Sequence, residues 1–162
     1  MAGLDERELE HGMTVVRASA EVQASPERVW AIVSDPRNLP HWDRRIEAVE
    51  DLPADGLERG ATYTTVMRFM AVHGHVHAEV LEWDPPRRST IRLSGLLEAT
   101  VTTTVTGLDG HRSRLEHEID YRFRGGALGE LAARSLRLVG GAQFALRHGT
   151  LAQVREIERR SR

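Results

Sequence analysis

The most regular stretch of the chain is an alternation of apolar and polar positions from 113 to 123. A period of two places alternate side chains on opposite faces of a β-strand. The first set consists of Leu115, His117, Ile119, Tyr121 and Phe123, and the second of Arg114, Glu116, Glu118, Asp120 and Arg122. The pattern predicts a strand whose first set faces the protein interior.

Weaker forms of this pattern, rich in Val, Thr, Tyr and Phe, predict six further strands. They cover residues 14–23, 46–52, 61–72, 75–83, 90–93 and 99–106. Turn residues separate them, most clearly Asp84-Pro85-Pro86 and Leu108-Asp109-Gly110. Residues 61–72 and 75–83 carry mixed patterns, so the inward face of these two strands stays open.

Two short helices are predicted between the first and second strands. Ser25 is placed to cap the first helix, with Pro26 at its first position. Asp35-Pro36 predicts the start of a second short helix that reaches Leu39.

A stripe of apolar or small residues, which includes Leu138 and Ala142, predicts one long helix from Leu128 to about Arg159. Gly140-Gly141 interrupts this stripe. The glycines indicate either a kink with close packing against the sheet or space left for a ligand.

This order of elements is typical of an α+β fold. One amphipathic helix cannot cover both faces of a seven-stranded sheet, so we expect the sheet to curl around the helix and share one apolar interior with it. We expect a flexible N-terminal segment at 1–12 and a single domain at 13–160.

Composition and charge narrow the classes of function. The 162 residues have a net charge of -2, which gives no reason to expect a nucleic-acid or anionic-membrane surface. The acidic N-terminus lacks the apolar stretch of a signal peptide, so we expect a cytoplasmic protein. The chain has no cysteine and all 22 basic residues are arginine, which excludes thiolate and lysine Schiff-base chemistry.

Three stretches resemble the START-like superfamily with the Bet v 1 type of fold, and within it the polyketide cyclase/dehydrase group (SRPBCC). They are Ala24 to Trp30, Asp35-Pro36 through His41-Trp42-Asp43, and Val80 to Arg88. The resemblance implies a helix-grip fold, in which a curved seven-stranded antiparallel sheet surrounds the long C-terminal helix. It also implies a deep cavity for lipids, sterols, plant hormones or polyketides. Some members close poly-β-ketone chains by aldol reactions with loss of water, and others only carry ligands.

Tyr121 and His117 are the first candidates for catalysis, because both should face an apolar interior. A phenol and an imidazole there could act as general acid and base. Alternatively, each is a core residue whose polar tip has a buried partner. Arg68 and Arg92 could stabilise an enolate if they face inward, but the alternation of their strands favours solvent for both.

The remaining candidates would line the cavity, although core packing explains these positions equally well. They are Trp30, Trp42, Tyr63, Met67, Phe69, Ile119, Phe123, Leu138 and Ala142. Trp42 is interpreted mainly as an anchor of the loop before the second strand.

His73, His75 and His77 alternate along one predicted strand, a spacing that can chelate zinc. Inward-facing Val76 and Ala78 would turn the three histidines outward, so a surface cluster is the alternative. We assign no metal and no cofactor.

Two functions remain open. The first is a cyclase of bacterial secondary metabolism, such as antibiotic biosynthesis, acting on a polyketide-like substrate. The second is a non-catalytic carrier or sensor of a lipid-like or aromatic ligand. The expected partner is a small hydrophobic molecule, with no nucleic acid and no membrane; a homodimer and a carrier-protein-tethered substrate stay open.

Overall fold

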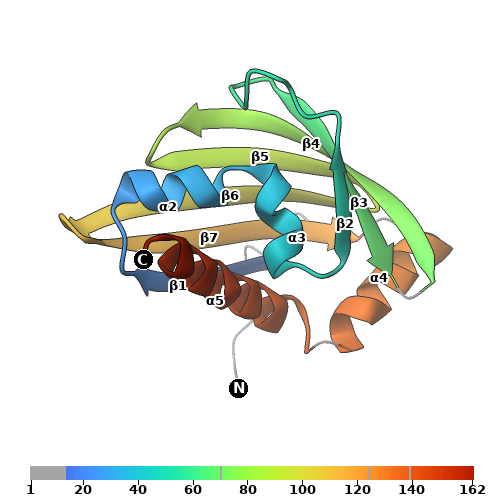
Figure 1. Cartoon of the computed structure of the whole chain (residues 1–162). Coiled ribbons are helices and arrows are strands. Elements are labelled where there is room, and N and C mark those ends of the chain that lie inside the picture. The colour runs from blue at the N-terminus through green and yellow to red at the C-terminus, as the bar shows by residue number, and fades with distance from the viewer. Residues whose placement is uncertain (1–13, 70, 124, 139) are drawn as a thin grey trace.

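The computed structural model describes residues 14–69, 71–123, 125–138 and 140–162. Seven antiparallel strands form one curved sheet in the order β1-β7-β6-β5-β4-β3-β2 (Figure 1). The strands are β1 Thr14–Val22, β2 Ile46–Glu50, β3 Thr62–Phe69, β4 Val72–Asp84, β5 Arg88–Gly95, β6 Leu97–Asp109 and β7 Arg112–Phe123. The expected α+β helix-grip fold is confirmed.

Two short helical segments connect β1 to β2 on the concave side of the sheet. Helix α2 (Pro26–Val33) begins as predicted, with the Ser25 hydroxyl accepting a hydrogen bond from the Arg28 N–H at 3.4 Å. The 3₁₀ helix η1 (Pro36–Asn38) leads directly into α3 (Leu39–Trp42). Both α2 and α3 lie on the same side of the sheet as the last helix (Figure 1).

The expected long C-terminal helix is present as α5 (Ala142–Arg160), but its predicted extent from Leu128 as one helix is wrong, because the chain forms a separate α4 (Ala127–Leu138) before it. The Gly141 N–H donates to the Leu136 carbonyl at 3.0 Å and the Gly140 N–H donates to the Arg137 carbonyl at 3.1 Å. This hydrogen-bond pair is a Schellman C-cap, which needs a residue with positive φ, and Gly140 has φ of 96°. The apolar stripe continues across the glycines, but the helix does not.

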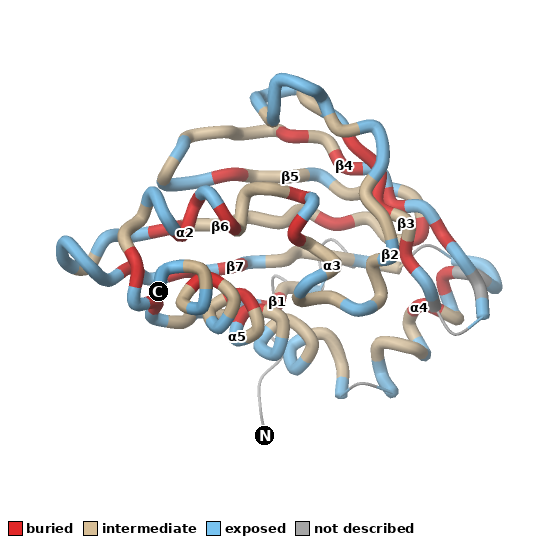
Figure 2. Tube along the Cα trace, viewed as in Figure 1, coloured by how far each residue is buried: buried red, intermediate tan, exposed pale blue. Residues whose placement is uncertain are grey.

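The core consists of two clusters at opposite ends of the concave face (Figure 2). The first joins α2 and α5 to β1, β6 and β7, and contains Val22, Ala24, Val29, Trp30, Ile32, Val105, Leu115 and Ile157. The second lies under α4 and contains Met67, Val76, Leu96 and Ala132. None of the described helices is both long and apolar enough to cross a bilayer.

The inward faces of β3 and β4, which the sequence left open, follow from burial and strand pairing. Tyr63 and Met67 of β3 are buried and pair with Ala78 and Gly74 of β4. Val76, Ala78 and Val80 are also buried, so the histidines that alternate with them on β4 lie on the convex face.

Candidate functional site

The concave face is only partly covered between the two core clusters. Ile91, Val101 and Ile119 form one row across β5, β6 and β7, and all three are half-buried. Helix α5 packs chiefly against β1, so it covers the middle strands less closely. An apolar interior that stays partly accessible is the kind of surface on which hydrophobic ligands bind.

A pocket of about 340 Å³ opens where the ends of β7 and β1 meet α4 and the start of α5. We call it the Tyr121 pocket. Its lining residues are Thr14, Tyr121, Arg122, Phe123, Ala133, Leu136, Arg137, Gly141 and Ala142. The break between α4 and α5 forms one wall, where Gly141 lines the pocket.

Tyr121 contributes the one phenol of this pocket. Its ring meets Phe123 edge-on, with centroids 5.7 Å apart and an interplanar angle of 77°. Partial burial raises the pKa of Tyr121 above its ordinary value, so the hydroxyl is protonated at neutral pH. The phenol has no hydrogen-bond partner among the described residues, which leaves it free to donate to a ligand.

Two arginines, Arg122 and Arg137, line the Tyr121 pocket, and neither is among the site residues predicted from the sequence. The Arg122 Nε is 2.6 Å from the Glu98 carboxylate, so its charge is already compensated. Arg137 forms no ion pair with any described residue. A single continuous helix would put Arg137 on its polar side; the separate course of α4 brings it to the pocket instead.

His117 lies on the same strand and face as Tyr121, but in a different environment. It is 8% exposed, and its ring connects β7 to β6 and α5. The Thr103 hydroxyl lies 2.9 Å from Nδ1, and Nε2 lies 2.7 Å from the Gln153 Oε1. Because an amide oxygen only accepts, Nε2 carries the proton and Nδ1 accepts from Thr103. Both ring nitrogens are therefore engaged within the protein.

Burial lowers the pKa of His117 from its ordinary value, although the hydrogen bond to Gln153 partly opposes the shift. The folded protein then binds this proton at lower pH than the unfolded chain does. We expect a stabilising contribution that is fully present above about pH 6.5 and is lost as the pH falls through the folded pKa. Denaturant unfolding measured from about pH 7.5 down to about pH 5 should show this decline.

The matched variants are His117→Gln and His111→Gln, since His111 is exposed. His117→Gln should remove most of the pH dependence in that window, whereas His111→Gln should keep it. An unchanged pH profile in His117→Gln would show that His117 is not the group responsible.

Arg68 and Arg92 lie on the convex face, where the alternation of their strands had placed them. The Arg68 Nε is 3.3 Å from a Glu47 oxygen, and the Arg92 Nη1 is 3.2 Å from a Glu79 oxygen. The hypothesis that either arginine faces inward as an oxyanion partner is therefore wrong.

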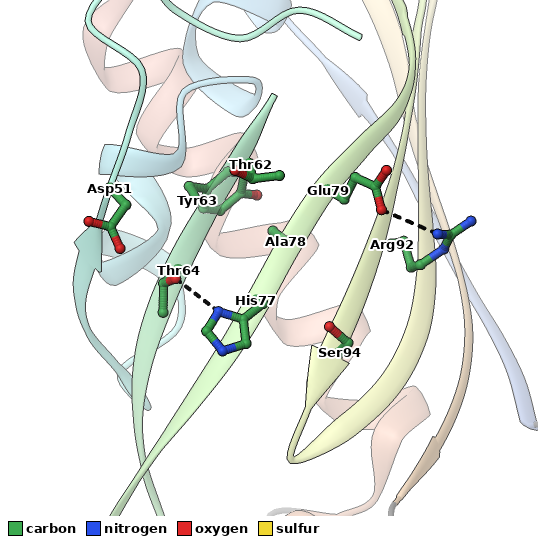
Figure 3. A pocket seen from close by; sticks show the side chains of 9 residues that line it. All are labelled: Asp51, Thr62, Tyr63, Thr64, His77, Ala78, Glu79, Arg92 and Ser94. Atoms are coloured by element: carbon green, nitrogen blue, oxygen red, sulfur yellow. Dashed lines mark hydrogen bonds and ion pairs between the residues drawn. The ribbon is translucent and has the colours of Figure 1, made fainter. Parts of the chain in front are cut away.

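A second depression of about 340 Å³ lies on this convex face, over β3, β4 and β5 (Figure 3). The Thr64 hydroxyl lies 3.1 Å from the His77 Nδ1 on one side, and the Glu79–Arg92 ion pair lies on the other. Four of its polar lining residues, Thr64, His77, Glu79 and Arg92, are already paired with one another, which leaves them less available to a ligand.

The three alternating histidines do not converge. The His73 Nε2 is 2.9 Å from a Glu47 oxygen, while His77 is bonded to Thr64. Within the described ranges, no three His, Asp or Glu side chains form a group that could hold a metal ion.

The expected cavity residues are distributed over several regions. Trp30 lies in the first core cluster, edge-on to Trp83 at 5.2 Å, and Trp42 packs beside that cluster. Met67 lies in the second cluster, and burial raises the pKa of Tyr63 to about 12. The Phe69 side chain lies outside the described residues.

Four further candidates lie on β7, α4 and α5, the elements that also form the Tyr121 pocket. Ile119 points to the partly open concave face, and Phe123 and Ala142 line the Tyr121 pocket. Leu138 is 74% exposed, so its assignment to the inward stripe is wrong. The helix break explains this, because Leu138 ends α4 and does not continue the register of α5.

Comparisons with known proteins agree with this architecture. A family model described as "Polyketide cyclase / dehydrase and lipid transport" matches residues 13–148. The uncharacterized protein Rv1546 of Mycobacterium tuberculosis is 32% identical over 128 residues, which cover 77% of this chain and 90% of that protein.

Two solved structures share the fold at low sequence identity. The Zhui aromatase/cyclase from Streptomyces sp. R1128 is 17% identical with a TM-score of 0.71, covering 93% of this chain and 96% of that one. A START superfamily protein from Mycobacterium smegmatis is 18% identical with a TM-score of 0.65, covering 90% and 97%.

Proposed function

Because this chain belongs to the polyketide cyclase/dehydrase and lipid transport family, we propose that its Tyr121 pocket binds a small hydrophobic poly-carbonyl or aromatic metabolite and promotes its cyclisation with loss of water. The observation that carries the proposal is the protonated Tyr121 phenol, which has no hydrogen-bond partner among the described residues and lies beside Phe123 in a pocket that Ala133, Leu136 and Ala142 also line. A likeness of fold to an aromatase/cyclase is consistent with this activity.

Tyr121 would act on the carbonyl oxygen of the substrate. In an aldol closure, the enolate carbon attacks a ketone carbon, a C–C bond forms, and the ketone oxygen takes up the negative charge. The Tyr121 hydroxyl donates its proton to that oxygen and is reprotonated from water, so the intermediate becomes an alcohol, which then loses its hydroxyl and an α-proton as water. A methylene between two carbonyls ionises readily in water, so the deprotonation itself needs no strong base from the protein.

Arg137 would supply the electrostatic part of the same site. Its guanidinium lies at the rim without a carboxylate partner among the described residues, so it can face an enolate or carboxylate oxygen of the ligand. Contacts with the pocket lining would hold the substrate chain in a folded conformation, and orientation of this kind contributes much of the rate in intramolecular closures.

A second function, that of a carrier without turnover, is favoured by the state of His117. Both of its ring nitrogens are engaged by Thr103 and Gln153, and no carboxylate or histidine occurs among the lining residues of the Tyr121 pocket. A pocket with a hydrogen-bond donor and no protein base suits binding and release as well as catalysis.

Ligand binding is the first test of the proposal. An aromatic polyketone at about 100 times its dissociation constant should stabilise the folded protein by about 2.7 kcal/mol, which thermal unfolding detects as a rise of several degrees. Ala133→Phe should abolish the rise, because the larger side chain fills the pocket.

The matched control is Arg134→Phe, at the next position of α4 and outside the pocket lining, which should keep the ligand response. If both variants respond like the wild type, the ligand binds elsewhere and the pocket assignment is wrong. Stabilisation by fatty acids alone would favour the carrier function.

A further inference from the structure

The large apolar side chains that the described part of the chain exposes all lie in its C-terminal helices. They are Leu138 at 74%, Phe144 at 48% and Leu151 at 39% exposure. Leu138 ends α4, and the other two residues lie on α5, seven positions apart and thus on one side of the helix. Exposed apolar side chains gathered in one region mark an interaction surface more often than isolated ones do.

Phe144 packs against the break between the two helices. A Cβ added at Gly140 would lie 3.0 Å from the Phe144 ring, so this ring rests against the linking glycine. Phe144 also stacks on His148, with ring centroids 4.3 Å apart and an interplanar angle of 27°. The two helices follow one another along the lower edge of the molecule in Figure 1.

The same region is basic and free of acidic residues. Between Glu130 and Glu156 the sequence contains four arginines and one histidine but no aspartate or glutamate. Arg134 pairs with Glu130 at 3.4 Å, whereas Arg137, Arg147 and Arg155 have no ion-pair partner in the described ranges. The net charge of -2 for the whole chain averages over this local excess. For that reason, total charge gave no sign of a basic surface.

We propose that this surface, formed by Leu138, Phe144, Arg147, His148, Leu151 and Arg155 and here called the α4–α5 face, docks on an anionic lipid membrane. Apolar side chains flanked by arginines are the pattern of helices that lie in a membrane interface, with the arginines meeting lipid phosphates. The face adjoins the Tyr121 pocket, since Arg137 precedes Leu138 directly and Gly141 and Ala142 lie just before Phe144, and all three line that pocket. Docking would therefore bring the pocket close to a reservoir of hydrophobic molecules.

Charge argues against a second copy of this chain as the occupant. A two-fold dimer through the α4–α5 face would bring the unpaired arginines of both copies into one interface with no acidic residue from either face to compensate them. An anionic lipid surface complements the charge and also accepts the apolar side chains without needing matched pockets.

Vesicle sedimentation tests the proposal with the full chain. The protein should bind vesicles of equal parts phosphatidylglycerol and phosphatidylcholine, bind pure phosphatidylcholine far less, and dissociate as salt is raised. The double variant Arg147→Gln/Arg155→Gln should weaken binding about thirtyfold, since each arginine near an anionic surface contributes about a fivefold change. Leu138→Ser/Phe144→Ser should weaken it as well, with the circular dichroism spectrum unchanged.

The matched control is Arg68→Gln/Arg92→Gln, which removes the same charge from the convex face and should bind as the wild type does. Absence of wild-type binding to the anionic vesicles, or equal losses in both arginine pairs, would overturn the proposal. Binding to polyglutamate without binding to vesicles would assign the face to an acidic protein instead. A dimer that Phe144→Ser dissociates would assign it to self-association. Tyr121→Phe should leave vesicle binding intact, so this test is independent of the proposed catalysis.

Discussion

Replacement of Tyr121 by phenylalanine should lower turnover of a poly-carbonyl substrate by about a hundredfold or more and change ligand affinity only a few-fold. The variant keeps the aromatic ring against Phe123 and removes only the hydroxyl that faces the ligand. That hydroxyl matters most when the carbonyl oxygen takes up negative charge, so its loss affects kcat more than KM. Steady-state kinetics and calorimetric binding, measured on the same preparations, separate the two effects.

Tyr63→Phe provides the matched control, because Tyr63 is the other tyrosine of the chain and is absent from the lining of the Tyr121 pocket. It undergoes the same chemical change, and its burial raises its pKa to about 12, so it too is a neutral phenol. Turnover should survive in Tyr63→Phe. If it survives in Tyr121→Phe and fails in Tyr63→Phe, the proton donor has been assigned to the wrong tyrosine.

A third result would change the function itself. If ligands bind with the expected affinity and neither the wild type nor the variants show turnover, the chain is a carrier, and Tyr121 serves as a hydrogen-bond donor for recognition. The engaged ring of His117 is consistent with that outcome, since no second proton-transfer group reaches the pocket from β7.

The strands could be predicted from the sequence because their signal is local. Period-two alternation predicted 113–123, and β7 covers Arg112–Phe123. The inward faces of β3 and β4 could not be predicted, because polar and apolar residues occur on both faces. Pairing settles them, as when Tyr63 meets Ala78 across two strands.

The site was harder to predict because its contacts are made at long range. Thr103 and Gln153, which fix the state of His117, lie 14 and 36 residues away in sequence. The role of Arg137 depends on where the helix breaks, because α4 and α5 run in different directions (Figure 1). The apolar stripe in the sequence does not show this change in the direction of the helix. The glycine pair was the available signal, because it marks the point where the helix ends.

Replacement of Leu115 by alanine should lower the free energy of unfolding by about 3 to 5 kcal/mol. Leu115 is 0% exposed and lies in the first core cluster with Val22, Val105 and Ile157, where strands β1, β6 and β7 meet α5. A cavity at this closed end has side chains fixed on every side and little freedom to collapse. In thermal unfolding the melting temperature should fall by about 10 °C or more for a domain of this size.

Ile119→Ala is the informative comparison, because Ile119 lies four residues along the same strand and on the same face, but is only half-buried. Its truncation should cost less than half as much as that of Leu115, since solvent already reaches the concave face there. A bound ligand should then increase the difference in unfolding free energy between the wild type and Ile119→Ala. The loss of unfolding free energy in Leu115→Ala should stay unchanged. Equal costs for the two variants without ligand would show that the middle of the sheet is packed as tightly as its closed end, and the space proposed for the ligand would be absent.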